Sequence, residues 1–137
     1  MKIITIMKED EVYEASTEAG KKAVIDMRDG ALRQHQNPVE MLLSSLSACG
    51  AVDIVLMLKK RRKTVIDFVI ETEGKRREEM PRSFTAIHCH YIVTSPDVTE
   101  EELYKSAKLS LDKYCTVAAS LKAEITFSVK INVPTEK

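Results

Sequence analysis

The sequence predicts an α+β domain built from six strands, one long helix and a second helical segment. Two observations carry this prediction. Short segments in which apolar and polar residues alternate stand toward both ends of the chain, and a long apolar helix lies between them. The length of 137 residues is the usual size of one domain, so we expect a single domain over residues 1–137.

The expected elements follow one another in a simple order. We expect three strands at 2–7, 11–16 and 22–27, followed by the long helix at 37–62. Two strands at 64–74 and 84–95, a helical segment at 95–124 and a last strand at 125–133 complete the chain. The loop 28–36 leads into the long helix, and the polar loop 75–83 joins two strands that we expect to form a hairpin.

Charge and composition narrow the class of protein. Lysine plus arginine equals aspartate plus glutamate at 21 each, so no net field attracts nucleic acid or an anionic membrane. The N-terminus reaches Lys8 before a signal-peptide core could form, and the apolar run 41–58 is interrupted by serines and by Asp53. We therefore expect a cytoplasmic protein. In a reducing cytosol, we expect its three cysteines to be either buried core residues or redox-active thiols.

The long helix has recognisable ends. Asn37 is a good N-cap, Pro38 suits the first helical position, and Glu40 stands where a capping-box acid reaches back to the N-cap amide. At ~1.5 Å per residue the helix is about 37 Å long, whereas a domain of this size has a radius of gyration of ~14 Å. Because apolar residues lie on every side of it, the helix needs cover all round. We therefore expect a homodimer.

A short run of histidine and cysteine could suggest a metal site. On a strand, His88 and His90 share one face and Cys89 points to the other, so at most two ligands converge. A zinc site needs three or four protein ligands, and we expect no metal here. Cys89 is expected to be a packed core thiol.

Two stretches resemble a known family. The long helix reads "NPVEMLLSSLSACGAVDIV" from Asn37, and "KYCTVAASL" follows about sixty residues later. Together they resemble the OsmC/Ohr family of thiol-dependent peroxidases, and "RREEMPRSFTAIHCHYIVT" is similar to its less characterised OsmC-like subgroup. The resemblance implies antiparallel sheets packed around long central helices in an intertwined homodimer, with sites at the subunit interface.

The resemblance also implies roles for individual residues. It assigns attack on a peroxide to Cys49 and resolution of the oxidised thiol to Cys115. The thiolate is the reacting form, and Cys49 lies too far into its helix to use the dipole, so it needs a cation from another segment. Arg28 is the first candidate for that cation. The substitutes are Arg33, Arg77 and Arg82.

The family's arginine is oriented by an acid that directly follows the proline. In this chain Val39 holds that place, and the acid, Glu40, comes one residue later. One residue is ~100° around a helix, enough to redirect a side chain. Glu40 therefore either caps the helix or orients the arginine. Cys115, near a helix start, would have its thiolate favoured by the dipole.

Two functions stay open. The first is a peroxidase in oxidative stress defence, which reduces organic hydroperoxides or hydrogen peroxide at Cys49, closes a disulfide with Cys115 and uses no cofactor. A cellular dithiol would restore the thiols, and the family implies a lipoylated protein for this role. The second is a non-catalytic or redox-sensing dimer that binds an apolar ligand at the subunit interface.

Overall fold

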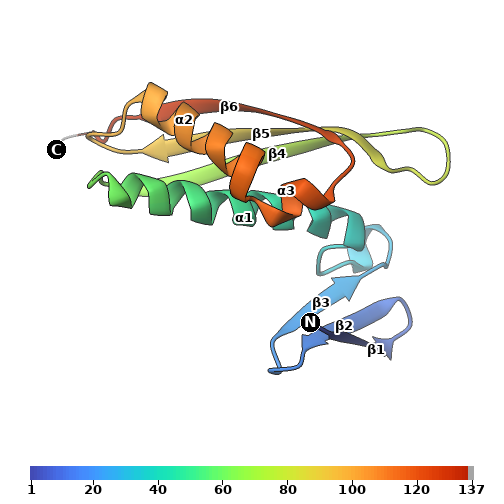
Figure 1. The fold of residues 1–137 in the computed structure, drawn as a ribbon. Helices are drawn as coiled ribbons and strands as arrows, with labels where there is room; N and C mark the ends of the chain where they lie inside the picture. The colour runs from blue at the N-terminus through green and yellow to red at the C-terminus, as the bar shows by residue number, and fades with distance from the viewer. Residues whose placement is uncertain (136–137) are drawn as a thin grey trace. The chain divides into compact units, whose positions relative to one another are not determined.

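The computed structural model describes residues 1–135 and contains the expected α+β order of elements (Figure 1). The elements are β1 (Ile3–Glu9), β2 (Val12–Thr17), β3 (Lys22–Asp26), η1 (Gly30–Leu32), α1 (Pro38–Lys60), β4 (Asp67–Arg76), β5 (Phe84–Thr94), α2 (Glu100–Leu109), η2 (Ser110–Tyr114), α3 (Thr116–Ser120) and β6 (Glu124–Asn132). The backbone divides into two compact units, Met1–Leu42 and Leu43–Lys137. The single domain expected from chain length stays a prediction.

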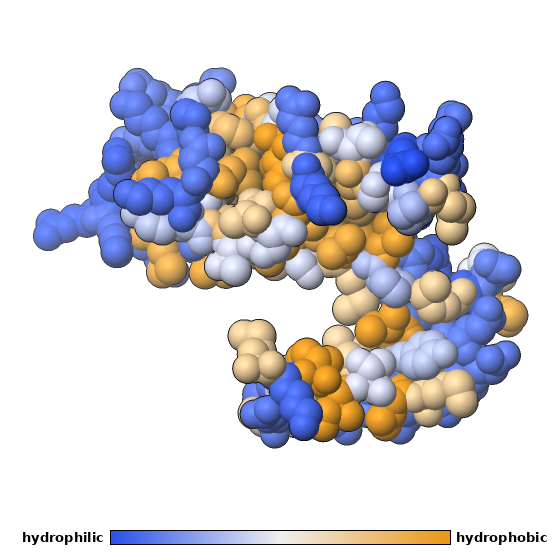
Figure 2. Space-filling model, turned by 45° about the vertical axis from the view of Figure 1, so that its right-hand side comes forward, coloured by the Kyte–Doolittle hydropathy of each residue, from blue (hydrophilic) through white to orange (hydrophobic). Residues whose placement is uncertain are grey.

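The N-terminal unit is an antiparallel sheet in the order β1-β2-β3. Of the described residues 1–42, only Val12 and Asp26 are buried. Every residue of β1 is exposed, and Ile4 and Ile6 keep 52% and 47% of their surface in solvent. Hydrophobic side chains therefore stand at the surface of this unit (Figure 2). A three-stranded sheet without a covered apolar face is marginal in water.

The C-terminal unit holds the hydrophobic core. Its sheet has the order β4-β5-β6, in which β4 and β5 form the predicted antiparallel hairpin and β6 pairs parallel to β5. The parallel pair is reached through the helical segment, as parallel strands require a crossover connection. Side chains from α1, α2 and one face of β5 meet in a single buried cluster that includes Ile54, Leu103 and Tyr91.

Helix α1 begins as the sequence predicts. The Asn37 amide donates to Glu40 Oε1 at 3.1 Å, and the Glu40 amide donates to Asn37 Oδ1 at 2.8 Å, which confirms the capping box. The helix ends at Lys60, where Arg62 adopts a positive φ of 60° and Lys63 N–H reaches back to Leu58 O at 3.1 Å.

Only one stripe of α1 is buried within the chain. Leu46, Gly50, Ile54 and Leu58 follow one another at intervals of four residues and face the core. Among the described residues, α1 alone is long and apolar enough to cross a membrane, a test that core helices also pass; 22% of that stretch is buried. Apolar residues elsewhere on the helix, such as Val52 and Leu56, are exposed.

The second helical segment is interrupted. Thr99 and Glu102 form the capping box of α2, and η2 then widens the helix into one π turn. Cys115 ends this turn, with its N–H donating to Ser110 O at 2.7 Å, and becomes the N-cap of the short helix α3. The sequence predicted a helical segment over 95–124 with Cys115 near a helix start, and the structure places Cys115 at the start of α3.

Candidate active site

The structure brings Cys49 and Cys115 together within the C-terminal unit. Cys49 lies on α1 beside the buried stripe and is partly exposed, whereas Cys115 is 3% exposed at the start of α3. Both are free thiols, and the Cys49 thiol lies close enough to Cys115 to raise the pKa of the Cys115 thiol. Cys115 follows the π turn, at the point where the backbone becomes extended before α3 begins. One accessible thiol and one buried thiol therefore face each other.

Burial dominates the chemistry of Cys115. It raises the pKa of this thiol to about 11, although the Ala118 N–H, 3.4 Å from the sulfur, works in the opposite direction. The neighbouring Cys49 raises the pKa of Cys115 further. The sequence predicts that the helix start would favour the Cys115 thiolate. The structure reverses this balance because α3 is only five residues long and the sulfur is desolvated.

A side-chain hydrogen bond joins the two segments that carry the thiols. Asp53 stands one turn after Cys49 on α1, and its Oδ2 accepts the Ser110 hydroxyl at 3.0 Å. Ser110 is also the first residue of the π turn and is fully buried. Sequence analysis missed this pair, although an acid within an otherwise apolar helix, four residues after a cysteine, was a visible signal.

An apolar hollow of about 290 Å³ lies between α1 and the second helical segment. Its lining includes Asp53 and Lys60 from α1 and Tyr114, the sequence neighbour of Cys115, and is otherwise aliphatic. The aliphatic side chains are Leu56, Met57 and Leu109. A hollow of this composition suits a small organic molecule with a polar end.

Arg28, the first candidate for the cation that Cys49 requires, is bound to Asp26 in the N-terminal unit. Its Nη2 lies 2.8 Å from Asp26 Oδ2 and its Nε donates to Oδ1 at 3.0 Å. The Arg28 guanidinium holds the pKa of Asp26 well below its usual range, against the opposing effect of burial. The Gln34 N–H also donates to this carboxylate at 2.8 Å. Arg28 therefore anchors the loop that follows β3.

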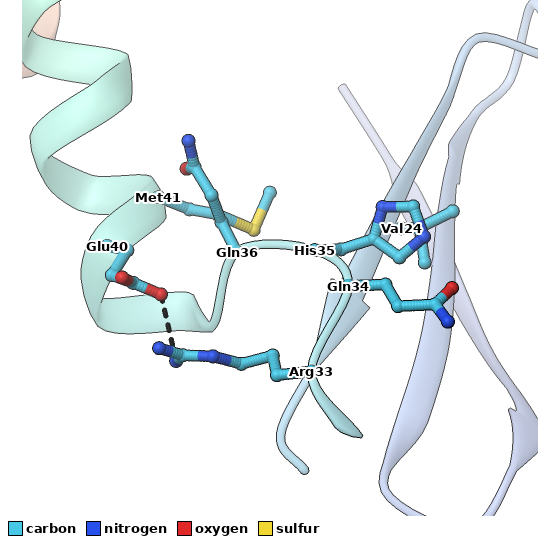
Figure 3. Close-up of a pocket in the computed structure, with 7 residues that line it drawn as sticks. All are labelled: Val24, Arg33, Gln34, His35, Gln36, Glu40 and Met41. Atoms are coloured by element: carbon cyan, nitrogen blue, oxygen red, sulfur yellow. Dashed lines mark ion pairs between the residues drawn. The ribbon is translucent and has the colours of Figure 1, made fainter. Parts of the chain in front are cut away.

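Glu40 pairs with Arg33, one of the substitute candidates. Arg33 Nη1 lies 2.9 Å from Glu40 Oε1 (Figure 3). The same carboxylate oxygen accepts the Asn37 N–H, so Glu40 caps the helix and holds an arginine at once. The capping interpretation is confirmed, and the role of Glu40 in orienting the arginine of Cys49 stays a prediction. A hollow of about 510 Å³ borders this pair, with His35 and Met41 in its wall (Figure 3).

The other two candidates lie at the loop between β4 and β5. The Arg77 guanidinium pairs with Glu79 at 3.4 Å, and Arg82 takes part through its backbone carbonyl, which accepts Arg76 Nε at 2.7 Å. Of the four arginines that the sequence offers, Arg33 is the one that Glu40 binds.

The histidines occupy the sheet face opposite the core. Ser128 Oγ lies 2.6 Å from His90 Nδ1 and 2.9 Å from His88 Nε2, and Cys89 is fully buried on the other face. The alternation predicted for this strand is therefore confirmed. Within residues 1–135 no group of three or more His, Cys, Asp or Glu side chains is placed to hold a metal ion.

Fold and site together define an α+β protein with a thiol pair between a long helix and a π turn. Residues 30–130 match the family model described as OsmC-like protein, and the chain belongs to this family. It is 38% identical to protein YhfA of Escherichia coli K12 over 92 residues, which are 67% of this chain and 69% of YhfA.

Solved structures share the fold over nearly the whole chain. A hypothetical protein from Aquifex aeolicus has a TM-score of 0.80 at 29% identity, covering 99% of this chain and 97% of its own. An OsmC-like protein from Mycoplasma pneumoniae has a TM-score of 0.78 at 19% identity, with coverages of 98% and 96%. The organic hydroperoxide resistance protein OhrB of Bacillus subtilis has a TM-score of 0.61 at 13% identity, with coverages of 96% and 98%. At such identities the last two similarities establish the fold alone, which is the predicted OsmC-like fold.

Proposed function

We propose that this protein is a thiol-dependent peroxidase that reduces organic hydroperoxides at Cys49. The sulfur attacks the peroxide bond, gains one oxygen as a sulfenic acid and releases the alcohol, so that the sulfur is oxidised and the O–O bond is reduced. Cys115 then attacks the same sulfur, and its proton leaves with the hydroxyl group as water. A disulfide between the two cysteines results.

The observation that carries the proposal is the pairing of an accessible thiol with a buried one. Peroxide can reach Cys49, which is partly exposed. Cys115 is 3% exposed and its pKa is raised to about 11, so it is a poor first nucleophile, but it is already in contact with the sulfur that it would resolve. The geometry favours the assignment implied by the family resemblance, attack by Cys49 and resolution by Cys115. The apolar hollow lined by Leu56, Met57 and Leu109 supports an organic rather than an inorganic peroxide.

We assign the cationic role to Arg33. Glu40 holds Arg33 at 2.9 Å, while Arg28 is bound by Asp26 through two nitrogen atoms. The family pattern pairs the reactive cysteine's arginine with an acid at the start of the long helix. In this chain Glu40 comes one residue late but still pairs with an arginine, because Arg33 lies in the loop just before the helix.

We further propose a homodimer in which a second copy covers the exposed apolar faces. Helix α1 leaves Val52 and Leu56 59% and 54% exposed within one chain. Together with Phe68 and Ile70 of β4 they line an apolar hollow of about 330 Å³. The N-terminal sheet exposes a further apolar surface on β1. A second copy with the same surfaces is the partner that a long helix with apolar residues on all sides favours.

A dithiol is the class of reductant that restores this site. Two thiols on one molecule can open the Cys49–Cys115 disulfide and close their own, so that both protein thiols return with their protons. The family implies a lipoylated protein for this role. We propose that the reaction takes place in the cytoplasm, where such dithiols are kept reduced.

A single oxidation experiment tests the proposal. One equivalent of cumene hydroperoxide is added to the fully reduced protein, and intact mass and free thiols are followed over minutes. The expected result is the loss of two hydrogen atoms and of two thiols. Cys49→Ser should leave the mass unchanged, whereas Cys115→Ser should gain one oxygen atom.

Cys89→Ser is the matched control, because Cys89 is a third thiol buried in the same core. It should form the disulfide at the rate of the unsubstituted protein. Thiols that stay untouched in the unsubstituted chain would contradict the peroxidase and favour the non-catalytic dimer that binds an apolar ligand.

A further inference from the structure

One polar atom of the core has no partner in the reduced protein. The hydroxyl of Tyr91 is fully buried, and within residues 1–135 nothing forms a hydrogen bond with it. The Cys89 thiol lies close enough to influence its pKa, yet their contact lacks hydrogen-bond geometry. Buried hydroxyl groups almost always have a hydrogen-bond partner, so an orphan hydroxyl, one without a partner, requires an explanation.

The orphan hydroxyl lies against helix α1 next to the reactive cysteine. A Cβ atom built on Gly50, the residue after Cys49, would stand 3.1 Å from Tyr91 Oη and 3.9 Å from Ser110 Oγ. Glycine at this position allows the hydroxyl to approach the helix this closely. Charge on Cys49 or on Cys115 is felt at the hydroxyl and raises the pKa of Tyr91, after the larger effect of burial. The hydroxyl therefore belongs to the surroundings of both thiols.

The ring of Tyr91 is held in place by its neighbours. Phe68 meets it edge-on with ring centroids 6.0 Å apart, and Phe127 lies on it at 6.3 Å. Both rings are themselves packed against the core. A side chain that is fixed in this way cannot swing its hydroxyl to another partner, so a partner must come to it.

We propose that the Tyr91 hydroxyl donates a hydrogen bond to the oxygen that a peroxide leaves on Cys49, and that this bond helps the oxygen to depart when Cys115 attacks. The inference rests on the proposed function, since it concerns the second step of that reaction. In the reduced protein the Tyr91 hydroxyl has no hydrogen-bond partner. In the sulfenic acid state it gains a partner, and this hydrogen bond stabilises the sulfenic acid state relative to the reduced state.

The balance of the second step shows what the hydroxyl contributes. The Cys115 sulfur forms a bond with the Cys49 sulfur, the S–O bond breaks, and the Cys115 proton ends on the departing oxygen as water. Negative charge develops on that oxygen as the S–O bond lengthens. A neutral donor directed at it lowers the barrier, and Tyr91 remains protonated because burial raises its pKa well above the usual range.

Tyr91→Phe tests this role by separating the two steps. The first step is followed in a Cys115→Ala protein as the gain of one oxygen atom, with excess hydrogen peroxide as oxidant. The second step is followed in the protein with both cysteines, as disulfide formation and as the fraction of sulfenic acid that dimedone traps. We expect the phenylalanine variant to oxidise Cys49 at an unchanged rate and to form the disulfide roughly tenfold more slowly. Trapped sulfenic acid should accumulate accordingly.

Stability provides the second readout. Because the hydroxyl has no partner to lose, the reduced Tyr91→Phe protein should be at least as stable as the parent toward urea. Tyr104→Phe, which removes an exposed hydroxyl from the same unit, is the matched control and should change neither step. A Tyr91→Phe protein that forms the disulfide at the parent rate would overturn the inference. So would one that is slowed in both steps together with a loss of stability, since that pattern indicates a structural role.

The oxidant keeps this test apart from that of the proposed function. Excess hydrogen peroxide oxidises accessible thiols in proteins that are not peroxidases. If one equivalent of cumene hydroperoxide leaves the parent protein unchanged while excess hydrogen peroxide reveals the slowed second step, the peroxidase proposal fails and this inference stands. If Cys49 resists excess hydrogen peroxide as well, both fail.

Discussion

The two compact units of the chain are held together by different interactions. The C-terminal unit encloses a cluster in which Leu46, Ile54 and Leu103 have no exposed surface. In the N-terminal unit, Val12 is the one buried apolar residue among those described, and the other buried side chain is the carboxylate of Asp26. One unit is organised by apolar packing, and the other by strand pairing and a buried ion pair.

This difference teaches which unit the proposed second copy would stabilise more. A unit with its own core can be stable alone, whereas a small open sheet with an exposed apolar strand cannot bury enough surface to offset its conformational entropy. If the proposed dimer forms, the N-terminal unit is therefore the one that gains most from it. The thiol pair lies wholly in the unit with the core, and the Arg33–Glu40 pair lies in the unit without one.

Replacement of Val52 by aspartate should give the largest effect. If a second copy covers the exposed face of α1, a charge there is buried without a partner, and association should weaken at least about a hundredfold. Sedimentation equilibrium at micromolar concentration measures the change. Val69→Asp is the matched control, because Val69 is also exposed but alternates away from the core side of β4. Dimers of unchanged affinity in the Val52→Asp protein would contradict the proposed interface.

The arginines of the N-terminal unit should separate catalysis from stability. Arg33→Gln removes the cation that Glu40 holds and should lower the rate of Cys49 oxidation by cumene hydroperoxide roughly a hundredfold. Arg28→Gln leaves the Asp26 carboxylate buried without its cation, so it should destabilise the N-terminal sheet with little change in that rate. Stopped-flow oxidation and urea unfolding measure the two effects. The reverse assignment would restore Arg28 as the functional arginine.

As the pH is lowered, the N-terminal unit should be destabilised at a higher pH than the C-terminal unit that holds the core. The pKa of Asp26 is lowered, first by its hydrogen bond with Arg28, so the folded value lies below the unfolded value of ~3.9. The stabilising contribution is therefore present above about pH 4 and is lost as the pH falls through the folded pKa. Amide signals of β1–β3 in NMR spectra should weaken on acidification while those of β5 persist.

Asp26→Asn should abolish this pH dependence, because the group that titrates is gone. Glu9→Gln is its control, since Glu9 contacts the same arginine at 3.5 Å but is exposed, and the variant should keep the parent's acid response. Simultaneous loss of all amide signals in the parent protein would show that the two units unfold as one.

Ser110→Ala should have the smallest effect, and it acts within the unit with the core. It removes the hydrogen bond to Asp53 and should cost about 1 kcal/mol in the free energy of unfolding. Urea unfolding measures the loss, and Ser120→Ala, which removes an exposed hydroxyl that bonds Thr116 O, should cost less. Equal losses would indicate that Asp53 does not depend on Ser110.

Features encoded by neighbouring residues could be predicted from the sequence. The strands and the α1 cap at Asn37 and Glu40 depend on contacts within a few residues, and both were confirmed. The OsmC-like fold was predicted from the motif around Cys49 and confirmed by the family match.

Features that join distant or irregular segments could not be predicted. Glu40 pairs with Arg33 rather than Arg28 because a buried Asp26 binds Arg28, and no local pattern reveals which acid is buried. The orphan hydroxyl of Tyr91 depends on three elements packed together. The same is true of the bond between Asp53 and Ser110, 57 residues apart. Each requires the tertiary structure.

The π turn at Ser110–Tyr114 carries one residue more than an α-helical turn would need. The position of the second thiol therefore depends on the number of residues in the turn rather than on their identity. Removing a single residue from this turn would restore an ordinary helix and rotate Cys115 by ~100° relative to Cys49. A relative that retains both cysteines but lacks the extra residue would therefore have the thiols without the pair. Two chains with the same reactive residues can differ in chemistry by the length of one turn.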